Sequence, residues 1–423
     1  LAALDERIAL SFPAVMVSTA MQGGCSCENA SLLRIGQGNV HFAALFAPKP
    51  QGMTTANDWT KEMSRKGFPE LRQLYATLGQ PEAVMLHRDE ASPHNYNRAA
   101  RAAFYGWLNT HFRLGLPTPI VERDYQVLTK AELSVWDDAH PAPAAASPDF
   151  ERRLLRWFAD DAATQLQQAS PEERGRWVRS YAQALLGPAI RPDQLQVATE
   201  SSQPLSAHTE TRGRLLHTGR GEEVRFTCLR PAKPNGRTVL WLRDGGQATL
   251  RDASGNVRAD FQALLDQGLT VLAADLYLQG GAPVTRTRKV KETREVPAYT
   301  FGYNDCLVVQ RAHDVALLTA YARQAFPGPL AVASAGDPAL AALLAAYQQS
   351  PDNAFFATGG FRFTQLQDVH DPKFLPGGAK YGDVPGLIGN SPLAPTATHW
   401  TDDPQATEQD ALRWLRLVFA PGR

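Results

Sequence analysis

The sequence predicts an α/β protein built from doubly wound, mostly parallel sheets with helices on their faces. Two observations support this fold class. Short apolar runs alternate with amphipathic stretches along most of the 423 residues, as expected when crossover helices cover a parallel sheet. The alternation is interrupted by a Pro/Ala-rich stretch at residues 141–147, which indicates that two α/β units are joined by a connector.

The first unit, residues 1–125, is predicted from three apolar runs that have the length of buried strands. These runs are residues 14–19, 40–48 and 83–89. The amphipathic stretch 58–79 predicts two helices, and residues 99–112 carry apolar side chains at helical spacing. The alternation of strands and helices predicts a mostly parallel sheet with helices on its faces.

A helical linker is predicted over residues 126–193, and a second α/β unit over residues 194–423. Its predicted strands lie around Val197 and Leu215 and at residues 224–229, 238–243, 269–275 and 330–333. Its predicted helices cover residues 259–267 and 306–325, a stretch from residue 338, and a closing amphipathic stretch at 405–419. The βαβ order again favours a doubly wound sheet.

Composition excludes several classes of function. Lys plus Arg and Asp plus Glu both number 43, so no basic field favours nucleic acid as a partner. No apolar run is long enough to predict a membrane helix. The four cysteines cannot form a dense disulfide framework, and Cys25 and Cys27 have only His41 nearby, so we predict no metal site.

Polar residues that could carry chemistry follow the predicted strands of the first unit. Asp58 follows the run 40–48, and His94 follows the run 83–89 just before the last helix. An acid followed by a histidine is the order in which α/β-hydrolases supply the second and third members of a Ser, acid, His triad. The imidazole takes the serine proton while the carboxylate holds the ring in the correct tautomer.

Two structural alternatives stand beside this interpretation. Asp58 can be a helix N-cap with Glu62 nearby, and His94 can be a solvated loop residue. Trp59, directly after the acid, is our candidate for lining a substrate pocket, because its large aromatic ring offers a flat apolar face to a ligand.

A family resemblance extends this hypothesis. Residues 6–50, the segment GMTTANDWTKEM (52–63) and residues 93–112 resemble the C-terminal half of the catalytic domain of bacterial acetyl xylan esterase-like α/β-hydrolases. Residues 299–322 and 358–387 resemble the second, hydrolase-like domain of tandem members of that group. The resemblance implies that Asp58 is the triad acid and His94 the general base, and that no cofactor is needed.

The resemblance also implies that parts of the catalytic site lie elsewhere. Such enzymes carry the nucleophilic serine on a strand-to-helix elbow upstream of the position that matches Leu1, and part of the oxyanion hole comes from that turn. We therefore expect the nucleophile, and any export signal, upstream of this sequence. The expected location, periplasmic or secreted, follows only from the resemblance and a polysaccharide substrate.

Ser334 is the one candidate nucleophile of the second unit. It follows the run 330–333 and precedes a helix, but Val332 occupies the first glycine position of a G-x-S-x-G elbow. On the register of the resemblance the apex of the turn falls on Ala333. Its partners would come from His370 with Asp371, or from His399 with Asp402 or Asp403. The alternative is a structural serine at a helix N-terminus.

The sequence therefore supports two hypotheses. The first is a serine-type carbohydrate ester hydrolase that deacetylates plant polysaccharide, with Asp58 and His94 serving an upstream serine. Its partners are an esterified polysaccharide or oligosaccharide and, if the chain is one piece of a longer or cleaved protein, the missing N-terminal half. The second is a non-catalytic scaffold or glycan-binding, hydrolase-like module, favoured by the incomplete elbow around Ser334.

Overall fold

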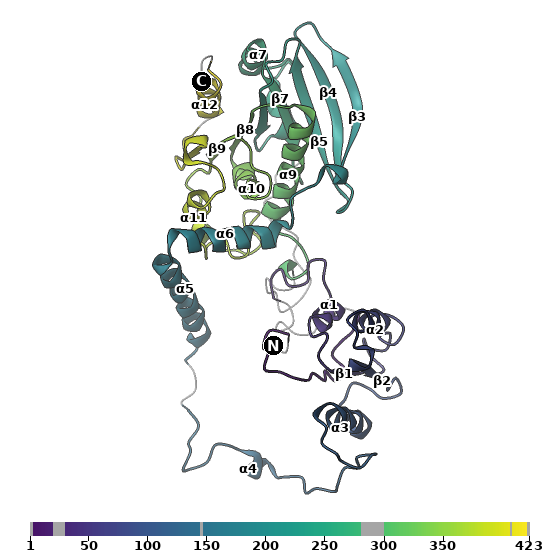
Figure 1. The fold of residues 1–423 in the computed structure, drawn as a ribbon. Helices are drawn as coiled ribbons and strands as arrows, with labels where there is room; N and C mark the ends of the chain where they lie inside the picture. The colour runs from purple at the N-terminus through teal and green to yellow at the C-terminus, as the bar shows by residue number, and fades with distance from the viewer. Residues whose placement is uncertain (1–2, 20–29, 144–146, 281–299, 407, 421–423) are drawn as a thin grey trace. The chain divides into compact units, whose positions relative to one another are not determined.

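The structure is a computed structural model that describes the chain except for residues 1–2, 20–29, 144–146, 281–299, 407 and 421–423 (Figure 1). The chain divides into two compact units. The first contains Leu1–Ser147 and Val296–Asn304, and the second contains Pro148–Glu295 and Asp305–Arg423. Each unit has its own sheet, and each is described by itself below.

The first unit is built around two parallel strands, β1 (Gln51–Thr54) and β2 (Val84–His87), with Gln51 opposite Val84. Four helices of this unit lie wholly within the described residues, namely α1 (Asn39–Ala44), α2 (Phe68–Thr77), α3 (Arg98–Phe112) and α4 (Lys130–Leu133). Met53, Met63 and Tyr75 are almost fully buried in its core. The predicted strand at 83–89 and the predicted helix at 99–112 are confirmed as β2 and α3.

Two of the predicted strands of this unit are wrong. Residues 40–48 begin with helix α1 and continue as turns. Val40 and Ala43 are its buried residues, and this spacing of three places both on one helical face. The strand beside β2 is instead β1, directly after Pro50. In residues 14–19, only an isolated parallel bridge from Ala14 to Thr54 forms.

An eight-stranded mixed sheet forms the second unit, in the spatial order β10-β9-β8-β6-β7-β5-β4-β3. Its strands are β3 (Leu195–Pro204), β4 (His208–His217), β5 (Glu222–Pro231), β6 (Thr238–Leu242), β7 (Thr270–Asp275), β8 (Leu330–Ala335), β9 (Asn353–Ala357) and β10 (Thr398–Thr401). β3, β4 and β5 run antiparallel at one side, and β6 to β10 are parallel to one another. The predicted α/β class with a mostly parallel sheet is confirmed for this unit.

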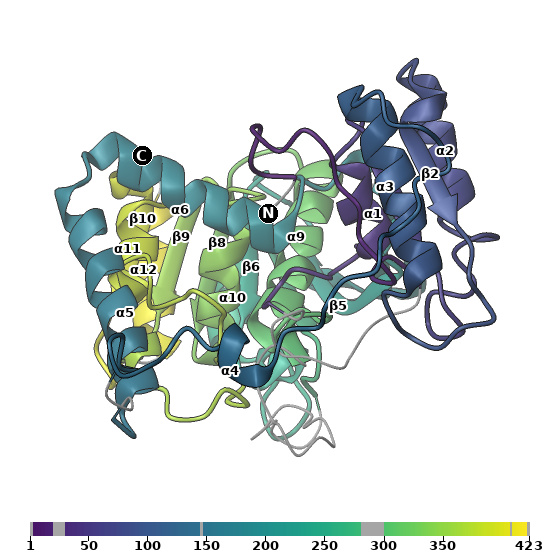
Figure 2. The same ribbon diagram turned by 90° about the horizontal axis from the view of Figure 1, so that it is seen from below.

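Helices cover both faces of this sheet (Figures 1 and 2). On one face, α7 and α12 pack on apolar side chains of β6, β7, β8 and β9, with Trp241 and Phe261 fully buried. On the other, α9 and α10 pack on each other and on the sheet, and α6 packs on α9. The helices are α5 (Phe150–Gln168), α6 (Pro171–Leu186), α7 (Ala259–Asp266), α9 (Leu307–Ala325), α10 (Asp337–Ala345), α11 (Asp383–Gly389) and α12 (Glu408–Val418).

Candidate functional site

Asp58 and His94 meet at the carboxyl edge of the two-stranded sheet. Asp58 lies four residues beyond β1 and His94 seven residues beyond β2, and the two strands are parallel. Two backbone hydrogen bonds join the loops that follow them. The N–H of Thr55 donates to the carbonyl of His87 (3.0 Å), and that of Asn57 donates to the carbonyl of Ser92 (2.8 Å). The strand pairing therefore brings together side chains 36 positions apart.

The carboxylate and the imidazole form a direct hydrogen bond. Nδ1 of His94 lies 2.9 Å from Oδ2 of Asp58. Oδ1 of Asp58 accepts from the N–H and the hydroxyl of Thr60, both at 2.7 Å. Burial by itself raises the pKa of Asp58, but the hydrogen bonds from Thr60 and His94 outweigh it and lower the pKa below its usual value. Asp58 is therefore held as a carboxylate that accepts from the ring.

The two side chains differ in their access to solvent. The Asp58 side chain is 12% exposed, whereas that of His94 is 49% exposed. A shielded carboxylate with an accessible imidazole is the arrangement that a general base needs, because Nδ1–H is oriented by the acid while Nε2 remains available for proton transfer. None of the described serines, threonines or cysteines forms a hydrogen bond with His94.

The loop that carries His94 is held by Asn97. The Asn97 side chain caps α3 by accepting from the N–H of Ala100 (2.9 Å), and its amide donates to the carboxylate of Asp89 (2.7 Å). Asn95 Oδ1 accepts from the N–H of Asn97 (2.7 Å). Sequence reasoning missed these positioning residues and Thr60. An asparagine directly before an apolar helical run is the N-cap signal that could have found Asn97.

Trp59 lies beside the histidine. The ring centroids of Trp59 and His94 are 4.8 Å apart, with the planes inclined by 32°. The backbone carbonyl of Trp59 accepts from the hydroxyl of Ser18 at 2.5 Å, which ties the residue to the segment before α1. The predicted role of Trp59 in substrate binding stays a prediction, while its position places an aromatic face next to the imidazole.

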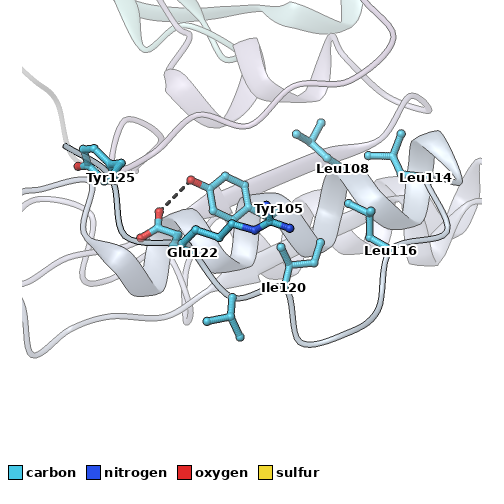
Figure 3. Close-up of a pocket in the computed structure, with 9 residues that line it drawn as sticks. Tyr105, Leu108, Leu114, Leu116, Ile120, Glu122 and Tyr125 are labelled. Carbon is cyan, nitrogen blue, oxygen red and sulfur yellow. Dashed lines mark hydrogen bonds between the residues drawn. The ribbon is translucent and has the colours of Figure 1, made fainter. Parts of the chain in front are cut away.

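A separate pocket of about 350 Å³ lies between α3 and the chain that follows it (Figure 3). Leu108, Leu116 and Ile120 give it an apolar lining. At its rim Glu122 accepts from the hydroxyl of Tyr105 (2.8 Å) and from the guanidinium of Arg101. Asp58 and His94 do not line this pocket, so it is distinct from the histidine site.

The second unit has a strand-to-helix turn after β8, where a hydrolase would carry its nucleophile. The apex is Gly336, with φ +77° and ψ −148°, and not Ala333, so the expected position of the apex is wrong. Ser334 lies two residues earlier with 0% exposure, and its hydroxyl donates to the carbonyl of Phe355 (3.2 Å). In the G-x-S-x-G pattern, Ser334 stands at the first glycine and Gly336 at the serine.

A carboxylate fills the space beside this turn. A Cβ atom added to Gly336 would lie 2.1 Å from Oδ2 of Asp244. Asp244 follows β6 and accepts from the N–H of Asp337 (2.9 Å). Burial and the neighbouring Asp337 carboxylate raise the pKa of Asp244. The turn therefore has no room for a nucleophilic side chain in this conformation.

The partners considered for Ser334 are engaged elsewhere. Asp402 pairs with Arg362, with Nη1 and Oδ1 2.9 Å apart. The ring of His399 stacks on Phe355 at 5.2 Å between centroids, and His370 is buried. The structure does not join these groups to Ser334.

Metal ligands do not gather in the described part of the chain, which contains no group of three or more His, Cys, Asp or Glu side chains placed to hold an ion. Cys25 and Cys27 lie outside the described residues. The described helices include none long and apolar enough to cross a membrane.

The chain matches no family model and no curated protein. Among solved structures it is similar to the methylesterase BT1017 (30% identity, 26% of each chain, TM-score 0.25). It is also similar to acetyl xylan esterase 1 from Thermoanaerobacterium sp. (14% identity, 45% of this chain and 63% of the other, TM-score 0.31). A third is a promiscuous CE15 esterase from a marine bacterial metagenome (12% identity, 56% and 77%, TM-score 0.37).

These three proteins are esterases, the class that the sequence resemblance names. The chain spans about a quarter of the first and less than two thirds of the second. At these TM-scores the alignments do not define the fold, which rests on the strand order described above.

Proposed function

We propose that the chain contributes the acid and the base of a serine-type carbohydrate ester hydrolase. The observation that carries the proposal is the 2.9 Å contact between Nδ1 of His94 and Oδ2 of Asp58 at the carboxyl edge of parallel strands. The nucleophile is a serine upstream of Leu1, as the family resemblance implies. Asp58 orients the ring, and Nε2 of His94 accepts the proton of that serine.

The mechanism has two steps that use the same ring. Proton transfer to Nε2 lets the serine oxygen attack the ester carbonyl, and the imidazolium that forms is stabilised by the Asp58 carboxylate. His94 then donates the proton to the departing sugar oxygen, which leaves as a hydroxyl group while the acyl group stays on the serine. In the second step water attacks the acyl group with His94 again as the base. The proton returns from His94 to the serine oxygen as the carboxylic acid is released. No cofactor takes part in these steps.

The proposed substrate is an acetylated plant polysaccharide or oligosaccharide of the xylan type, and the proposed location is periplasmic or secreted. Trp59 beside the imidazole supports a sugar substrate, because its ring can stack on a pyranose face. Acetate release from acetylated xylan and methanol release from methyl-esterified pectin, measured on the full-length protein, distinguish acetyl from methyl esters. Release of neither acid nor alcohol contradicts the proposal.

A variant of the base tests the assignment directly. We expect His94→Ala in the full-length protein to lower turnover by about 10³-fold or more, because the serine loses its proton acceptor. His140→Ala is the control, since His140 also pairs with an aspartate (Asp137, 2.9 Å) but is 73% exposed. Turnover within a few-fold of the parent for His94→Ala shows that His94 is not the base.

A second function is proposed for the second unit alone, as a non-catalytic, hydrolase-like module. The observation that favours it is Gly336 at the position of the nucleophile, with the Asp244 carboxylate in the space of a side chain. The test is labelling of the full-length protein with a serine-directed probe. We expect no label on a serine of the second unit, and a label there would contradict this function.

A further inference from the structure

A large cleft lies within the second unit, bounded by α5, α6 and the segment from Phe363 to Tyr381. Its volume is about 1210 Å³, which exceeds the ~300 to 1,000 Å³ of pockets for drug-sized ligands. It does not belong to the Asp58–His94 site, which is in the other unit. A cleft of this size can hold several linked sugar units.

Aromatic rings form much of the lining. Phe158 from α5, Trp177 and Tyr181 from α6, and Phe363, Phe374 and Tyr381 from the opposite wall line the cleft. The rings of Tyr181 and Tyr381 lie 4.5 Å apart between centroids, inclined by 31°. Phe158 is 55% exposed, so it presents apolar surface to a ligand. Rings of this kind pack against the C–H faces of pyranose sugars.

Polar groups are interspersed with the rings. The charged side chains that line the cleft are Arg156, Asp160, Asp161, Asp368 and Lys380, and Gln165, Ser180, Thr364 and Gln367 add hydrogen-bonding groups. Three carboxylates beside two cations give no positive field for a polyanion. Carboxylates and amides are instead suitable acceptors and donors for sugar hydroxyls. The lining therefore favours a neutral glycan over a polyuronate.

The wall opposite α5 is fixed by internal hydrogen bonds. The Asp383 carboxylate accepts from the N–H of Phe363 (2.9 Å), the N–H of Thr364 (3.1 Å) and the Thr364 hydroxyl (3.0 Å). The Tyr181 hydroxyl donates to the carbonyl of Pro376 (2.8 Å). Because these hydrogen bonds lie within the protein, the aromatic surface needs little ordering on binding.

We propose that this cleft binds a neutral oligosaccharide as a non-catalytic anchor for a polysaccharide chain. The partly exposed rings of Phe158, Trp177 and Tyr381 hold the sugar faces, and the carboxylates and amides bind the hydroxyls. The inference goes beyond the esterase proposal and does not depend on it, because no residue of the Asp58–His94 site lines the cleft.

Titration of the chain with xylohexaose, followed by calorimetry, tests the proposal. We expect binding in the millimolar range or tighter, and weaker binding of hexagalacturonic acid at the same salt concentration. Absence of heat at millimolar xylohexaose overturns the proposal. Tighter binding of the uronate overturns the assignment of a neutral glycan.

Two phenylalanines of α5 provide matched variants. Phe158 lines the cleft and Phe150 does not, although both are about half exposed, at 55% and 49%. Because both side chains are on the surface, neither change should prevent folding. We expect Phe158→Ala to weaken the binding of xylohexaose about ten-fold and Phe150→Ala to leave it unchanged. Equal affinity for the parent and Phe158→Ala, or a loss confined to Phe150→Ala, contradicts this site.

Asp58→Asn separates the two proposals. The variant should lose ester turnover and retain xylohexaose affinity, because the carboxylate is not in the cleft. Loss of sugar binding in Asp58→Asn would place the glycan at the histidine site and overturn the anchor.

Discussion

Replacing Asp58 by asparagine tests the mechanism at the level of a single proton. The carboxylate now accepts from His94 Nδ1 through Oδ2 and from Thr60 through Oδ1. In Asp58→Asn the amide oxygen can still accept from both Thr60 donors, and the amide nitrogen then faces Nδ1. That nitrogen is a donor, so Nδ1 has to accept and Nε2 carries the ring proton. The ring is then in the tautomer that cannot take a proton from serine.

The expected loss is large for catalysis and small for folding. The wrong tautomer costs about 10⁴-fold in kcat when the same change is made in a serine-protease triad, or about 5.5 kcal/mol in activation free energy. The free energy of unfolding should fall by only about 1 kcal/mol, because both Thr60 hydrogen bonds keep an acceptor. The assay is acetate release by the full-length protein, with urea unfolding measured in parallel.

The matched control is Asp137→Asn. Asp137 also lies 2.9 Å from a histidine, His140, but both side chains are more than 60% exposed, so this pair has no part in the mechanism. Its turnover should equal that of the parent. If Asp58→Asn retains turnover within about ten-fold of the parent while folded, the tautomer argument is refuted.

Three further predictions concern the turn after β8 and the segment after α3. Gly336→Ala should lower the free energy of unfolding, measured in urea, by about 2 kcal/mol or more. The positive φ of this residue is strained for alanine, and the new Cβ atom would lie 2.1 Å from the Asp244 carboxylate. Gly359→Ala, at φ +61° in open space, should cost only about 1 kcal/mol, and equal costs would contradict the steric argument. Ser334→Ala should leave ester turnover unchanged and lower stability by about 1 kcal/mol, since only one buried hydrogen bond is lost; a large loss of turnover would give it a catalytic role. Hydrogen bonds from Arg101 and Tyr105 lower the pKa of Glu122 to about 2. The ionised Glu122 therefore stabilises the folded protein at pH values above about 4.3, the pKa of glutamate in the unfolded chain, and this stabilisation is lost as the pH falls toward 2. Melting temperatures of the parent and Glu122→Gln should therefore converge between pH 4.5 and 2, and a constant difference would contradict the linkage.

The sequence predicted the meeting of Asp58 and His94 although the strand before Asp58 was misplaced. The order of an acid and a histidine after successive strands depends only on their being parallel, and β1 and β2 are parallel. The apolar run 40–48 has the composition of a strand, but its buried residues have helical spacing in α1. Tertiary packing determines whether this run adopts the strand or the helical period, and the composition of the run does not reveal which one is chosen.

Other features of the candidate site required coordinates. Thr60 is two residues from Asp58, and only the backbone conformation of that turn shows that both of its donors reach one carboxylate oxygen. The place of Gly336 at the apex depends on a positive φ, and a motif alignment that starts from Ser334 cannot show this. The cleft beside α6 is formed by segments about 200 residues apart in sequence, so no local pattern could have indicated it.

Labelling of the full-length protein with a fluorophosphonate serine-hydrolase probe, followed by peptide mapping, tests the central claim most directly. We predict a single labelled serine upstream of Leu1, with labelling slowed strongly in His94→Ala and unaffected in His140→Ala. A label on Ser334, or folded protein that takes no label, would contradict the assignment of Asp58 and His94 as the acid and base of an esterase.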